Sequence, residues 1–401
     1  MDGHLSIVVF NAGSSSLKFG LYDASAAPLA HGSLDWAGSS EEAELVFALA
    51  GGSSITTRPR VRGYREAVIR ALATMSDAAG QVTAIGQRVV HGGVRFSAPI
   101  RIDAEVKAEI SRRAELAPLH NPAALESIDA AEAVLPGVPQ IAVFDTSFYS
   151  TLSPAHHVYP LPYEWFEQWG IRRFGFHGIS HAYCSARASE LLARSEPLNV
   201  VTCHLGNGCS ATACRRGTAV ATTMGFTPMD GLMMGTRSGS VDPGILTYVQ
   251  KQRGVTAVAL EEVLNHGSGL KGVSGVSSDY REVENAAVAG NGRARLALEM
   301  YAGRVREAVG ALAVTLGRID ALVFTAGVGE HSATLRAAVC EGLQCLGLRL
   351  DARKNLACTA DADVATDDST GRILVIRTQE ELTIAREVSK VLSSSQGQVP
   401  A

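Results

Sequence analysis

The sequence predicts an α/β protein with some antiparallel hairpins, and two observations carry that prediction. Short apolar runs that are typical of buried strands alternate with segments of helical periodicity. A pattern of apolar strand, polar turn and second strand occurs at residues 7–20 ("IVVFNAGSSSLKFG") and again at residues 199–225 ("NVVTCHLGNGCSATACRRGTAVATTMG"). Two similar domains facing each other would produce this repeated pattern, and two unrelated hairpins would produce it as well.

The first hairpin follows from local composition. "LKFGLYD" (17–23) alternates apolar and polar residues with a period of two, so it indicates a strand and not the helix that follows a P-loop. No second glycine precedes Lys18, and no Ser or Thr follows it. Residues 11–16 are therefore the tip of a hairpin, with an unusual density of hydrogen-bonding groups.

The remaining elements are assigned by the same periodicities. We expect strands at residues 6–10, 17–22, 84–90, 139–144, 198–204, 211–214, 219–223, 321–325 and 373–377. We expect helices at residues 65–79, 104–115, 122–134, 180–194, 245–252, 258–265, 281–316, 332–346 and 379–394. The segment 281–316 is interrupted by "AGNGR" and should form two helices. Asn121 is the expected N-cap of helix 122–134, with Pro122 at its first position.

Composition limits the classes of function. The chain has 401 residues, 46% of them hydrophobic, which favours two folded domains with large cores. A net charge of -4 argues against a nucleic-acid partner. No apolar run approaches the roughly 18 residues that cross a bilayer, and Asp2 stands where a signal peptide would carry a basic residue. Seven cysteines without CxxC spacing favour reduced thiols and a cytoplasmic protein.

Five polar segments at strand ends or beside glycines could carry chemistry, because open α/β sheets bind ligands at strand ends. They are "GQRVVHGG" with Arg88 and His91, "APLHNP" with His120, "VFDTSF" with Asp145, "RRFGFHGISH" with Arg172, Arg173, His177 and His181, and "MGFTPMDGLMMGTRSGSVDPG" with Arg237. Each alone is compatible with a structural role. Together they supply the guanidinium forks that bind carboxylate or phosphate, and the acids that hold magnesium.

Three further turns fit a nucleotide. "HLGNGCS" (204–210) offers backbone N–H groups that could form a nest for phosphate oxygens. "FTAGVGEHS" (324–332) runs from a buried strand into a helix whose N-terminus favours an anion. "SSDYR" (277–281) places an acid and a base at a turn, suitable for ribose and purine edges.

The ordered motifs resemble those of acetate kinases over nearly the whole chain, from residue 11 to residue 382. They are "NAGSSSLKF", "RVVHGG", "PLHNP", "FDTSF", "FGFHGISH", "HLGNG", "MGFTPMDGLMMGTRSG", "SSDYR", "FTAGVGE" and "TQEEL". The resemblance implies the fold group of sugar kinases, heat-shock ATPases and actin, with two duplicated domains of mixed sheets flanked by helices and an active site in the cleft between them. It implies a first domain at 1–148, completed by the C-terminal helix 382–401, and a nucleotide-binding domain at 149–381.

The resemblance also implies roles for individual residues. The implied catalytic residues are Arg88, Asp145, His177 and Arg237. The implied acid-binding residues are Arg88, Val90, Leu119, His120, Phe176 and Pro228. The implied nucleotide-binding residues are Ser14, Ser16, Lys18, His204, Leu205, Gly206, Asn207, Gly208, Asp279, Tyr280, Arg281, Gly327, Val328, Gly329, Glu330 and His331. Asn11 and Glu380 match the residues linked to the metal.

The implied activity is reversible transfer of the γ-phosphoryl group of ATP to acetate, giving acetyl phosphate and ADP, with Mg²⁺ as cofactor and Mn²⁺ as a possible substitute. A homodimer is expected by family analogy. A carboxylate nucleophile has no proton to lose, so Asp145 is expected to hold geometry or a magnesium-bound water and not to act as a general base. Propionate or butyrate could be the phosphoryl acceptor instead. A third hypothesis is a nucleotide-dependent binding or chaperone module of the same fold group, which has no small-molecule phosphoryl acceptor.

Four positions depart from the family pattern. Gln87 stands where His is usual, Ala221 where Asp is usual, Ser240 where an acid is usual and His331 where Asn is common. None belongs to the catalytic or metal set, so activity should survive. Ser240 and His331 could alter nucleotide preference, dimer packing or the charge of the cleft.

Overall fold

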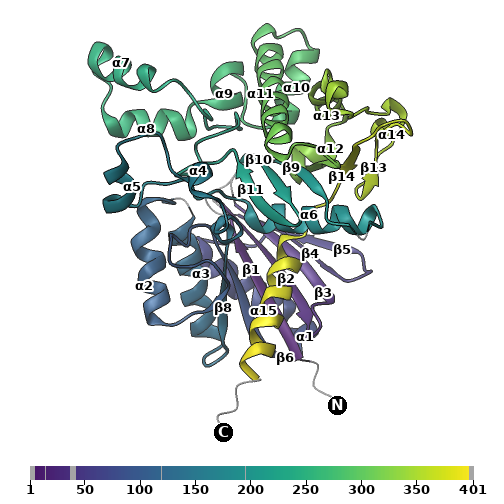
Figure 1. Cartoon of the computed structure of the whole chain (residues 1–401). Helices are drawn as coiled ribbons and strands as arrows, with labels where there is room; N and C mark the ends of the chain where they lie inside the picture. The colour runs from purple at the N-terminus through teal and green to yellow at the C-terminus, as the bar shows by residue number, and fades with distance from the viewer. Residues whose placement is uncertain (1–4, 14, 37–41, 119, 195, 397–401) are drawn as a thin grey trace. The chain divides into compact units, whose positions relative to one another are not determined.

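The computed structural model describes residues 5–13, 15–36, 42–118, 120–194 and 196–396. The chain divides into two compact units, and each is described by itself. Unit 1 comprises Met1–Ser150 and Gln379–Ala401, and unit 2 comprises Thr151–Thr378. The yellow helix α15 (Glu380–Gln396) in Figure 1 therefore belongs with the purple and blue strands of unit 1, although it lies at the other end of the sequence.

Unit 1 contains an eight-stranded sheet in the order β5-β4-β3-β2-β1-β6-β8-β7. Its strands are β1 (Leu5–Ala12), β2 (Ser16–Asp23), β3 (Pro28–Asp35), β4 (Glu44–Leu49), β5 (Ser54–Thr57), β6 (Gln81–Val89), β7 (Ile100–Arg101) and β8 (Gln140–Phe144). β1 and β2 form the predicted antiparallel hairpin, whereas β1, β6 and β8 run parallel. The sheet is therefore mixed.

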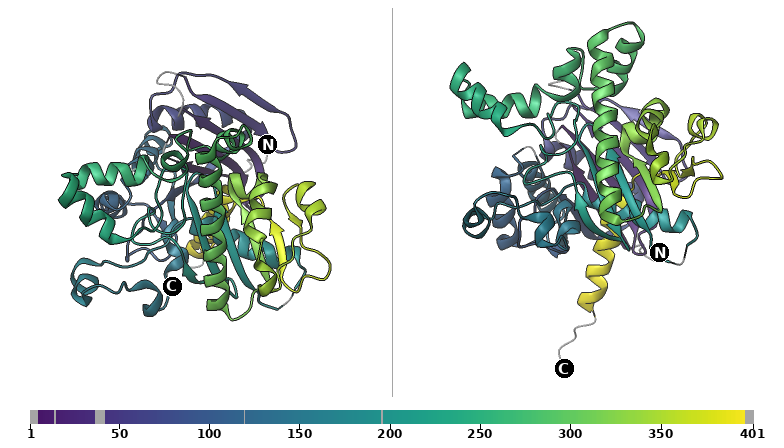
Figure 2. Two further views of the ribbon diagram at one scale, coloured as in Figure 1. Left: turned by 90° about the horizontal axis from the view of Figure 1, so that it is seen from above. Right: turned by 45° about the horizontal axis from the view of Figure 1, so that its top comes forward.

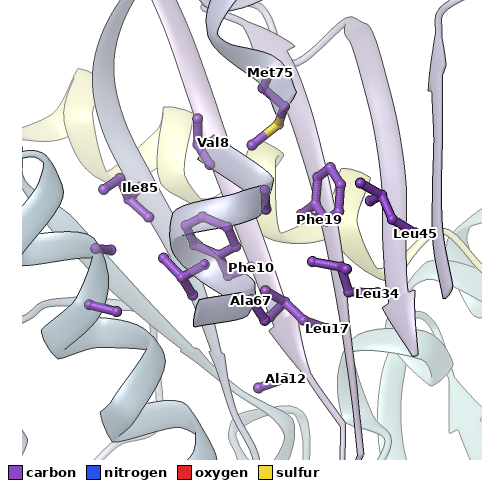
Figure 3. Packing of buried hydrophobic residues seen from close by; sticks show 14 of the residues in the cluster. Val8, Phe10, Ala12, Leu17, Phe19, Leu34, Leu45, Ala67, Met75 and Ile85 are labelled. Carbon is purple, nitrogen blue, oxygen red and sulfur yellow. The ribbon is translucent and has the colours of Figure 1, made fainter. Parts of the chain in front are cut away.

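Helices cover the sheet of unit 1. They are α1 (Tyr64–Ala79), α2 (Ala104–Arg112), α3 (Asn121–Val134) and α15, with short 3₁₀ helices η1 (Arg113–Glu115) and η2 (Asp145–Tyr149). Successive side chains of a strand point to opposite faces. Val8 and Phe10 of β1 therefore join Phe19 of β2, Ala67 and Met75 in the buried core beneath α1, as Figure 3 shows. The alternate residues of β1 face α15.

Helix α15 lies very close to β6, and a glycine permits this. A Cβ on Gly86 would lie 2.6 Å from Cγ2 of Ile384 and 3.0 Å from Cγ2 of Val388. Arg88, two residues further along β6, points to the same face of the sheet as Gly86. The sequence thus directs Arg88 toward the beginning of α15.

Unit 2 contains a six-stranded sheet in the order β11-β10-β9-β12-β14-β13. Its strands are β9 (Asn199–Leu205), β10 (Cys209–Arg215), β11 (Thr218–Thr222), β12 (Ala321–Thr325), β13 (Ala362–Asp363) and β14 (Arg372–Val375). Its helices are α4 (Pro154–His157), α5 (Tyr163–Trp169), α6 (Gly178–Leu191), α7 (Pro243–Arg253), α8 (Ala257–His266), α9 (Gly269–Ser274), α10 (Tyr280–Val288), α11 (Gly292–Leu316), α12 (Ala326–His331), α13 (Ala333–Cys340), η3 (Leu343–Leu346) and α14 (Ala352–Leu356). α6 packs on β9 and β12. The long α11, the long green helix of Figure 2, lies along β9, β10 and β11.

The two sheets share one topology, which confirms the predicted duplication. The order β3-β2-β1-β6-β8-β7 in unit 1 matches β11-β10-β9-β12-β14-β13 in unit 2. In each, an antiparallel meander of three strands is followed by two parallel neighbours and a short antiparallel strand. β4 and β5 extend the sheet of unit 1 beyond this common core and were not predicted.

Two local predictions were wrong. Asn121 does not cap α3: the helix begins at Asn121 with His120 at the N-cap position. The buried Asn121 side chain instead donates to the carbonyls of His91 and Ile110. Segment 332–346 is not one helix, because α13 ends at Cys340 and Gly342 (φ 85°) turns the chain into η3. None of the described helices is long and apolar enough to cross a membrane.

Candidate active site

Unit 1 gathers five polar side chains where β1, β6 and β8 end and α15 begins, and we call them the Arg88 cluster: Asn11, Arg88, Asp145, Glu380 and Glu381. Asn11 lies near the end of β1, Arg88 near the end of β6, and Asp145 directly follows β8. The two glutamates open α15. The parallel register of these strands brings their carboxyl ends to one edge of the sheet.

A continuous set of hydrogen bonds joins the Arg88 cluster. Arg88 donates to Asp145 from two nitrogens, with Nη2–Oδ2 2.6 Å and Nε–Oδ1 3.2 Å, and its Nη1 donates to Asn11 Oδ1 at 2.8 Å. Asn11 Nδ2 donates in turn to Glu380 Oε2 at 2.9 Å and to Glu381 Oε1 at 2.7 Å. Asn11 therefore orients two carboxylates and one guanidinium at once.

The charges of the Arg88 cluster do not balance. Burial works against the charge of Arg88, but the nearby carboxylates of Asp145 and Glu380 outweigh it and raise the pKa of Arg88 well above its usual range. Three carboxylates face one guanidinium, a formal charge of -2. Within the described residues, no group of three or more His, Cys, Asp or Glu side chains is arranged to enclose a metal ion by itself. The excess of negative charge is still the electrostatic environment that a divalent cation requires.

Unit 2 brings histidines to the face of its sheet that α6 covers. Thr202 and His204 of β9 pair across the hairpin with Thr212 and Ser210 of β10, so polar side chains recur every second residue in otherwise apolar strands. We call His177, Ser180, His181, His204 and Ser210 the histidine cluster. His177 precedes α6 with a left-handed backbone (φ 56°), a conformation that is uncommon for a non-glycine residue and concentrates at functional sites.

The histidine cluster is tightly hydrogen bonded. His177 Nδ1 lies 2.8 Å from Ser210 Oγ, and His181 Nε2 lies 2.7 Å from the same oxygen. His204 Nδ1 lies 2.8 Å from Ser180 Oγ. The rings of His177 and His204 stack with centroids 4.2 Å apart and planes 19° from parallel. Two imidazolium charges at that separation would repel by roughly 4 kcal/mol at an effective dielectric constant near 20, so the stack disfavours double protonation.

Arg237 meets the histidine cluster at the tip of the second hairpin. A Cβ on Gly208 would lie 3.2 Å from His177 Nε2 and 3.6 Å from Arg237 Nη1. Arg237 donates to the carbonyl of Pro228 at 2.9 Å, and within the described part of the chain it forms no ion pair with a carboxylate. Burial lowers the pKa of Arg237. A partly buried guanidinium without a carboxylate is expected to bind an anion.

The nucleotide-turn predictions have distinct local structures. The hairpin tip Gly206–Gly208 follows Leu205, which is buried in β9, and it leaves Asn207 exposed. Asp279 caps α10 and accepts from Arg281 Nη2 at 2.6 Å, so this acid and base bind each other. Tyr280 is buried beside them.

The last predicted turn, 327–331, is helical and forms most of α12. Gly327 and His331 are exposed, Gly329 is buried and Val328 is partly exposed. Glu330 accepts from the backbone N–H of Ala326 at 2.9 Å and of Thr378 at 3.1 Å. Ala326 has a left-handed backbone (φ 64°), so the turn is held in an unusual conformation at its start.

Buried aromatic residues that sequence analysis missed connect these turns. Tyr301 of α11 lies 2.8 Å from Cys209 Sγ, and Cys209 donates to the carbonyl of Gly206. The ring of Tyr301 also packs edge-on against Tyr280, with centroids 5.6 Å apart. Tyr301 therefore joins the hairpin tip to α10.

Arg336 supports the turn in α12 by donating to the carbonyls of Gly329 and Glu330.

The tip of the first hairpin is anchored by α1. Tyr64 donates to the carbonyl of Gly13 at 2.6 Å, and the backbone N–H of Gly13 donates to the carbonyl of Ser16 at 2.8 Å. Lys18 is exposed and stands opposite Asn11 in the hairpin. Ser14 lies outside the described residues.

The predicted acid-binding residues are divided between the units. Val90 and His120 belong to unit 1, and Phe176 and Pro228 belong to unit 2. Val90 and Phe176 are buried, whereas His120 and Pro228 are partly exposed. Leu119 lies outside the described residues.

Comparison with known proteins decides the family. The acetokinase family model matches residues 6–386. The chain belongs to the acetokinase family. It is 47% identical over 406 residues to an acetate kinase of Cyanothece sp., covering 98% of this chain and 99% of that one. Its structure is similar to that of acetate kinase from Porphyromonas gingivalis, with a TM-score of 0.86, 39% identity and coverage of 96% of this chain and 99% of the other. It is also similar to a propionate kinase from Francisella tularensis, with a TM-score of 0.88, 37% identity and coverage of 95% and 98%.

Two departures from the acetokinase pattern have clear local environments. Gln87 is buried, donates to Gln140 Oε1 and accepts from Ser127 Oγ, both at 2.9 Å, so its amide is well hydrogen bonded. Ser240 donates to Asp230 Oδ1. An acid in place of Ser240 would bring a second negative charge to Asp230. Of the other two, Ala221 is buried in β11 and His331 is exposed.

Proposed function

We propose that this member of the acetokinase family transfers the γ-phosphoryl group of ATP to a carboxylate oxygen of acetate, reversibly, giving acetyl phosphate and ADP. The observation that carries the proposal is the pairing of His177 Nε2 and Arg237 Nη1 beside Gly208. Arg237 has no described carboxylate partner, so its charge is available to an anion. Phosphoryl transfer depends mainly on such positioning and charge stabilisation.

The chemistry needs no general base. An acetate oxygen forms a bond to the γ-phosphorus, and the bond from that phosphorus to the β–γ bridging oxygen breaks, its electron pair leaving with ADP. The acid is already ionised near neutral pH because its pKa is near 4–5. Asp145 is hydrogen bonded to Arg88 at two positions, which supports an orienting role for this carboxylate.

We assign complementary roles to the two arginines. Arg88 would hold the carboxylate of the acid, and Arg237 with His177 would stabilise the charge on the transferring phosphoryl group. A plain nucleotide hydrolase would not need a second arginine for a carboxylate. The non-kinase alternative is therefore disfavoured.

The residues that match the family's nucleotide-binding positions complete the nucleotide proposal. The first hairpin would contribute Ser14, Ser16 and Lys18, and the second would contribute His204, Leu205, Gly206, Asn207 and Gly208. The adenosine would contact Asp279, Tyr280 and Arg281, and the last turn would contribute Gly327, Val328, Gly329, Glu330 and His331. Asp279 and Arg281 bind each other, so contacts of either side chain with a nucleotide would compete with that pair.

The Arg88 cluster fits a magnesium ion in charge and in ligand type. Mg²⁺ usually retains several waters and is held by one or two carboxylates together with substrate phosphates. Glu380 and Glu381 would supply carboxylate oxygens, and Asn11 would orient both through its amide. When bound, the ion would neutralise phosphate charge. Mn²⁺ favours the same oxygen ligands and could substitute.

A short acid is the proposed acceptor. By the family resemblance, the acid would contact Val90, Leu119, His120, Phe176 and Pro228. One methylene changes discrimination by only about 1–3 kcal/mol, so propionate should also react. The similarity to a structure named propionate kinase favours propionate as the second candidate, ahead of butyrate.

We also propose a cytoplasmic homodimer. All seven cysteines are free thiols, which suits a reducing compartment.

Helices α7 and α8 contain no buried residue, and five apolar side chains on or next to them are exposed: Val241, Ile245, Tyr248, Val258 and Val263. A second copy of the chain is the proposed occupant of this α7–α8 surface. Sedimentation equilibrium should give a dimer, and Y248D/V258D should give a monomer.

A hydroxamate assay tests the activity. The chain is incubated with magnesium, ATP and either acetate, propionate or butyrate, and acyl phosphate is trapped with hydroxylamine. We expect kcat/KM to decrease from acetate to propionate to butyrate. Product with propionate but none with acetate would establish the second candidate instead, and no acyl phosphate with any acid would overturn the kinase proposal.

A further inference from the structure

A chain of hydrogen bonds runs through the interior of unit 2 and ends at His177. Thr202 Oγ1 lies 2.6 Å from His181 Nδ1, His181 Nε2 lies 2.7 Å from Ser210 Oγ, and Ser210 Oγ lies 2.8 Å from His177 Nδ1. Thr202, His181 and Ser210 have no exposed surface. We call Thr202, His181 and Ser210 the relay. Its members have little use as mere packing groups, because apolar side chains would fill β9, β10 and α6 without the cost of burying polar atoms.

The number of hydrogens on each group determines which atom donates and which accepts in each hydrogen bond of the relay. A hydroxyl group has one hydrogen, and a neutral imidazole has one N–H. Two other neighbours could accept the Thr202 hydrogen. The carbonyl of Thr212 lies at 3.4 Å, beyond the usual O–H···O range of about 2.5–3.0 Å, and the sulfur of Cys214, which is hydrogen bonded to Thr202, is only a weak acceptor. The Thr202 hydrogen is therefore directed to His181 Nδ1.

The remaining protons are then determined in sequence. With Nδ1 as acceptor, neutral His181 carries its hydrogen on Nε2 and donates to Ser210. Ser210 consequently donates its own hydrogen to His177 Nδ1. His177, in turn, carries its hydrogen on Nε2, the atom that lies beside Gly208 and Arg237.

His204 is held by an independent chain of the same polarity. Thr378 Oγ1 donates to Ser180 Oγ at 2.9 Å, so the hydrogen of Ser180 is directed to His204 Nδ1 at 2.8 Å. His204 also carries its hydrogen on Nε2. The close stacking of the two rings is compatible with two neutral imidazoles.

We propose that the relay fixes His177 as the neutral Nε2–H tautomer, which makes Thr202, His181 and Ser210 positioning residues for the phosphoryl-transfer step. This inference rests on the proposed function for its catalytic meaning. The tautomer does not depend on that function. A neutral Nε2–H can donate to a phosphoryl oxygen while its charge state stays unchanged, and the wrong tautomer would present a lone pair to an anion. Control of tautomer by a buried neighbour has large effects in other enzymes.

Nitrogen-15 NMR of the histidine-labelled full chain, without ligands and near neutral pH, measures the tautomer directly. The His177 signals are assigned by their loss in His177→Gln. We expect an unprotonated Nδ1 and a protonated Nε2 on His177. An Nδ1–H tautomer or an imidazolium at His177 would overturn the proposal whether or not the chain proves to be a kinase.

A matched pair of variants separates positioning from structure. Thr202→Val removes the hydroxyl with little change of shape, and Thr202→Ser keeps it. We expect T202V to populate the other His177 tautomer and to lose about 10- to 100-fold in kcat with KM for ATP and acetate nearly unchanged, and T202S to retain both properties. An unaltered His177 spectrum in folded T202V would contradict the relay. If T202V does not fold, Ser210→Ala is measured in its place, and the wild-type spectrum remains decisive.

Discussion

Arg88 and Asp145 form a bidentate ion pair, in which two nitrogens of the guanidinium donate to the two oxygens of the carboxylate. Both side chains are largely buried, and their exposed fractions are 12% and 1%. Arg237, in contrast, has no carboxylate partner in the described part of unit 2. The two arginines therefore differ in what they contribute to stability, although we assign both to the same reaction.

Removing Arg88 should destabilise unit 1. Arg88→Met would leave Asp145 buried beside Glu380 and Glu381 without their compensating charge, and breaking a buried pair in this way typically costs about 3–5 kcal/mol. Urea unfolding measures the change. The double variant R88M/D145N should recover part of the loss, and R70M, on the exposed face of α1, should have no effect. Unchanged stability of R88M would contradict the charge argument.

Removing Arg237 should leave stability nearly unchanged and abolish most turnover. Arg237→Met loses one hydrogen bond to Pro228, worth about 1 kcal/mol, but it also removes a charge that burial disfavours. Loss of a donor that stabilises transition-state charge should reduce kcat by at least about 100-fold. The control is R295M on the surface of α11. An R237M variant that unfolds readily, or that retains its kcat, would show that Arg237 is mainly structural.

The buried His91 should make stability depend on pH. Burial, with a smaller contribution from Arg113, lowers the pKa of His91 to about 4. Between that value and the ordinary pKa near 6.5, the unfolded chain binds a proton that the folded chain does not, so this contribution is present above pH 6.5 and is lost as the pH falls. The linkage amounts to roughly 3 kcal/mol over that interval.

His91→Asn keeps an acceptor for the backbone N–H of Gly93 and does not titrate. The difference in unfolding free energy between the parent chain and H91N should therefore shrink as the pH falls from about 7 to about 4. The exposed variant His31→Asn serves as the matched control. Parallel pH curves for the parent chain and H91N would mean that His91 contributes nothing to this dependence.

The close approach of α15 to β6 should not tolerate a side chain at position 86. Gly86→Ala would press its methyl group against Ile384 and Val388, and overpacking of this kind costs about 1–3 kcal/mol. Because α15 begins with Glu380 and Glu381, G86A should also raise the magnesium concentration needed for half-maximal turnover. Ile384→Ala removes the Cγ2 atom that the new methyl group would meet, so G86A/I384A should lose less in both quantities than the sum of the two single variants. Full activity and stability of G86A alone would contradict the packing described for unit 1.

The sequence predicted the parts of the fold that local pattern determines. The hairpin at Asn11–Ser16 was found from alternation and turn residues, and its topological repeat in unit 2 was expected from the second copy of the pattern. β3 was missed because "PLAHGSLD" mixes polar and small residues without clear alternation. The prediction for Asn121 was wrong because cap propensity considers only neighbouring residues in the sequence. The backbone carbonyls of His91 and Ile110, which accept hydrogen bonds from the Asn121 side chain, come close to it only in the tertiary structure.

The candidate site was predicted less completely than the fold. Motifs identified Arg88, His177 and Arg237, yet they could not identify Glu381 as the second partner of Asn11 or the relay as the support of His177. A signal for the relay was present in the sequence. Thr202, His204, Ser210 and Thr212 recur with a period of two inside apolar strands. Only the packing of α6 on that face reveals that this polar stripe holds histidines.

Isotope transfer tests the central claim most directly. The chain is incubated with magnesium-ATP and acetate labelled with oxygen-18 in both carboxylate oxygens, and the product is cleaved with hydroxylamine, which attacks the carbonyl carbon and releases the bridging oxygen with phosphate. If a carboxylate oxygen attacks the γ-phosphorus, mass spectrometry will find one acetate-derived oxygen in each phosphate. Phosphate that lacks the label, or that takes up oxygen from labelled water, would mean that the chain hydrolyses ATP and is not a carboxylate kinase.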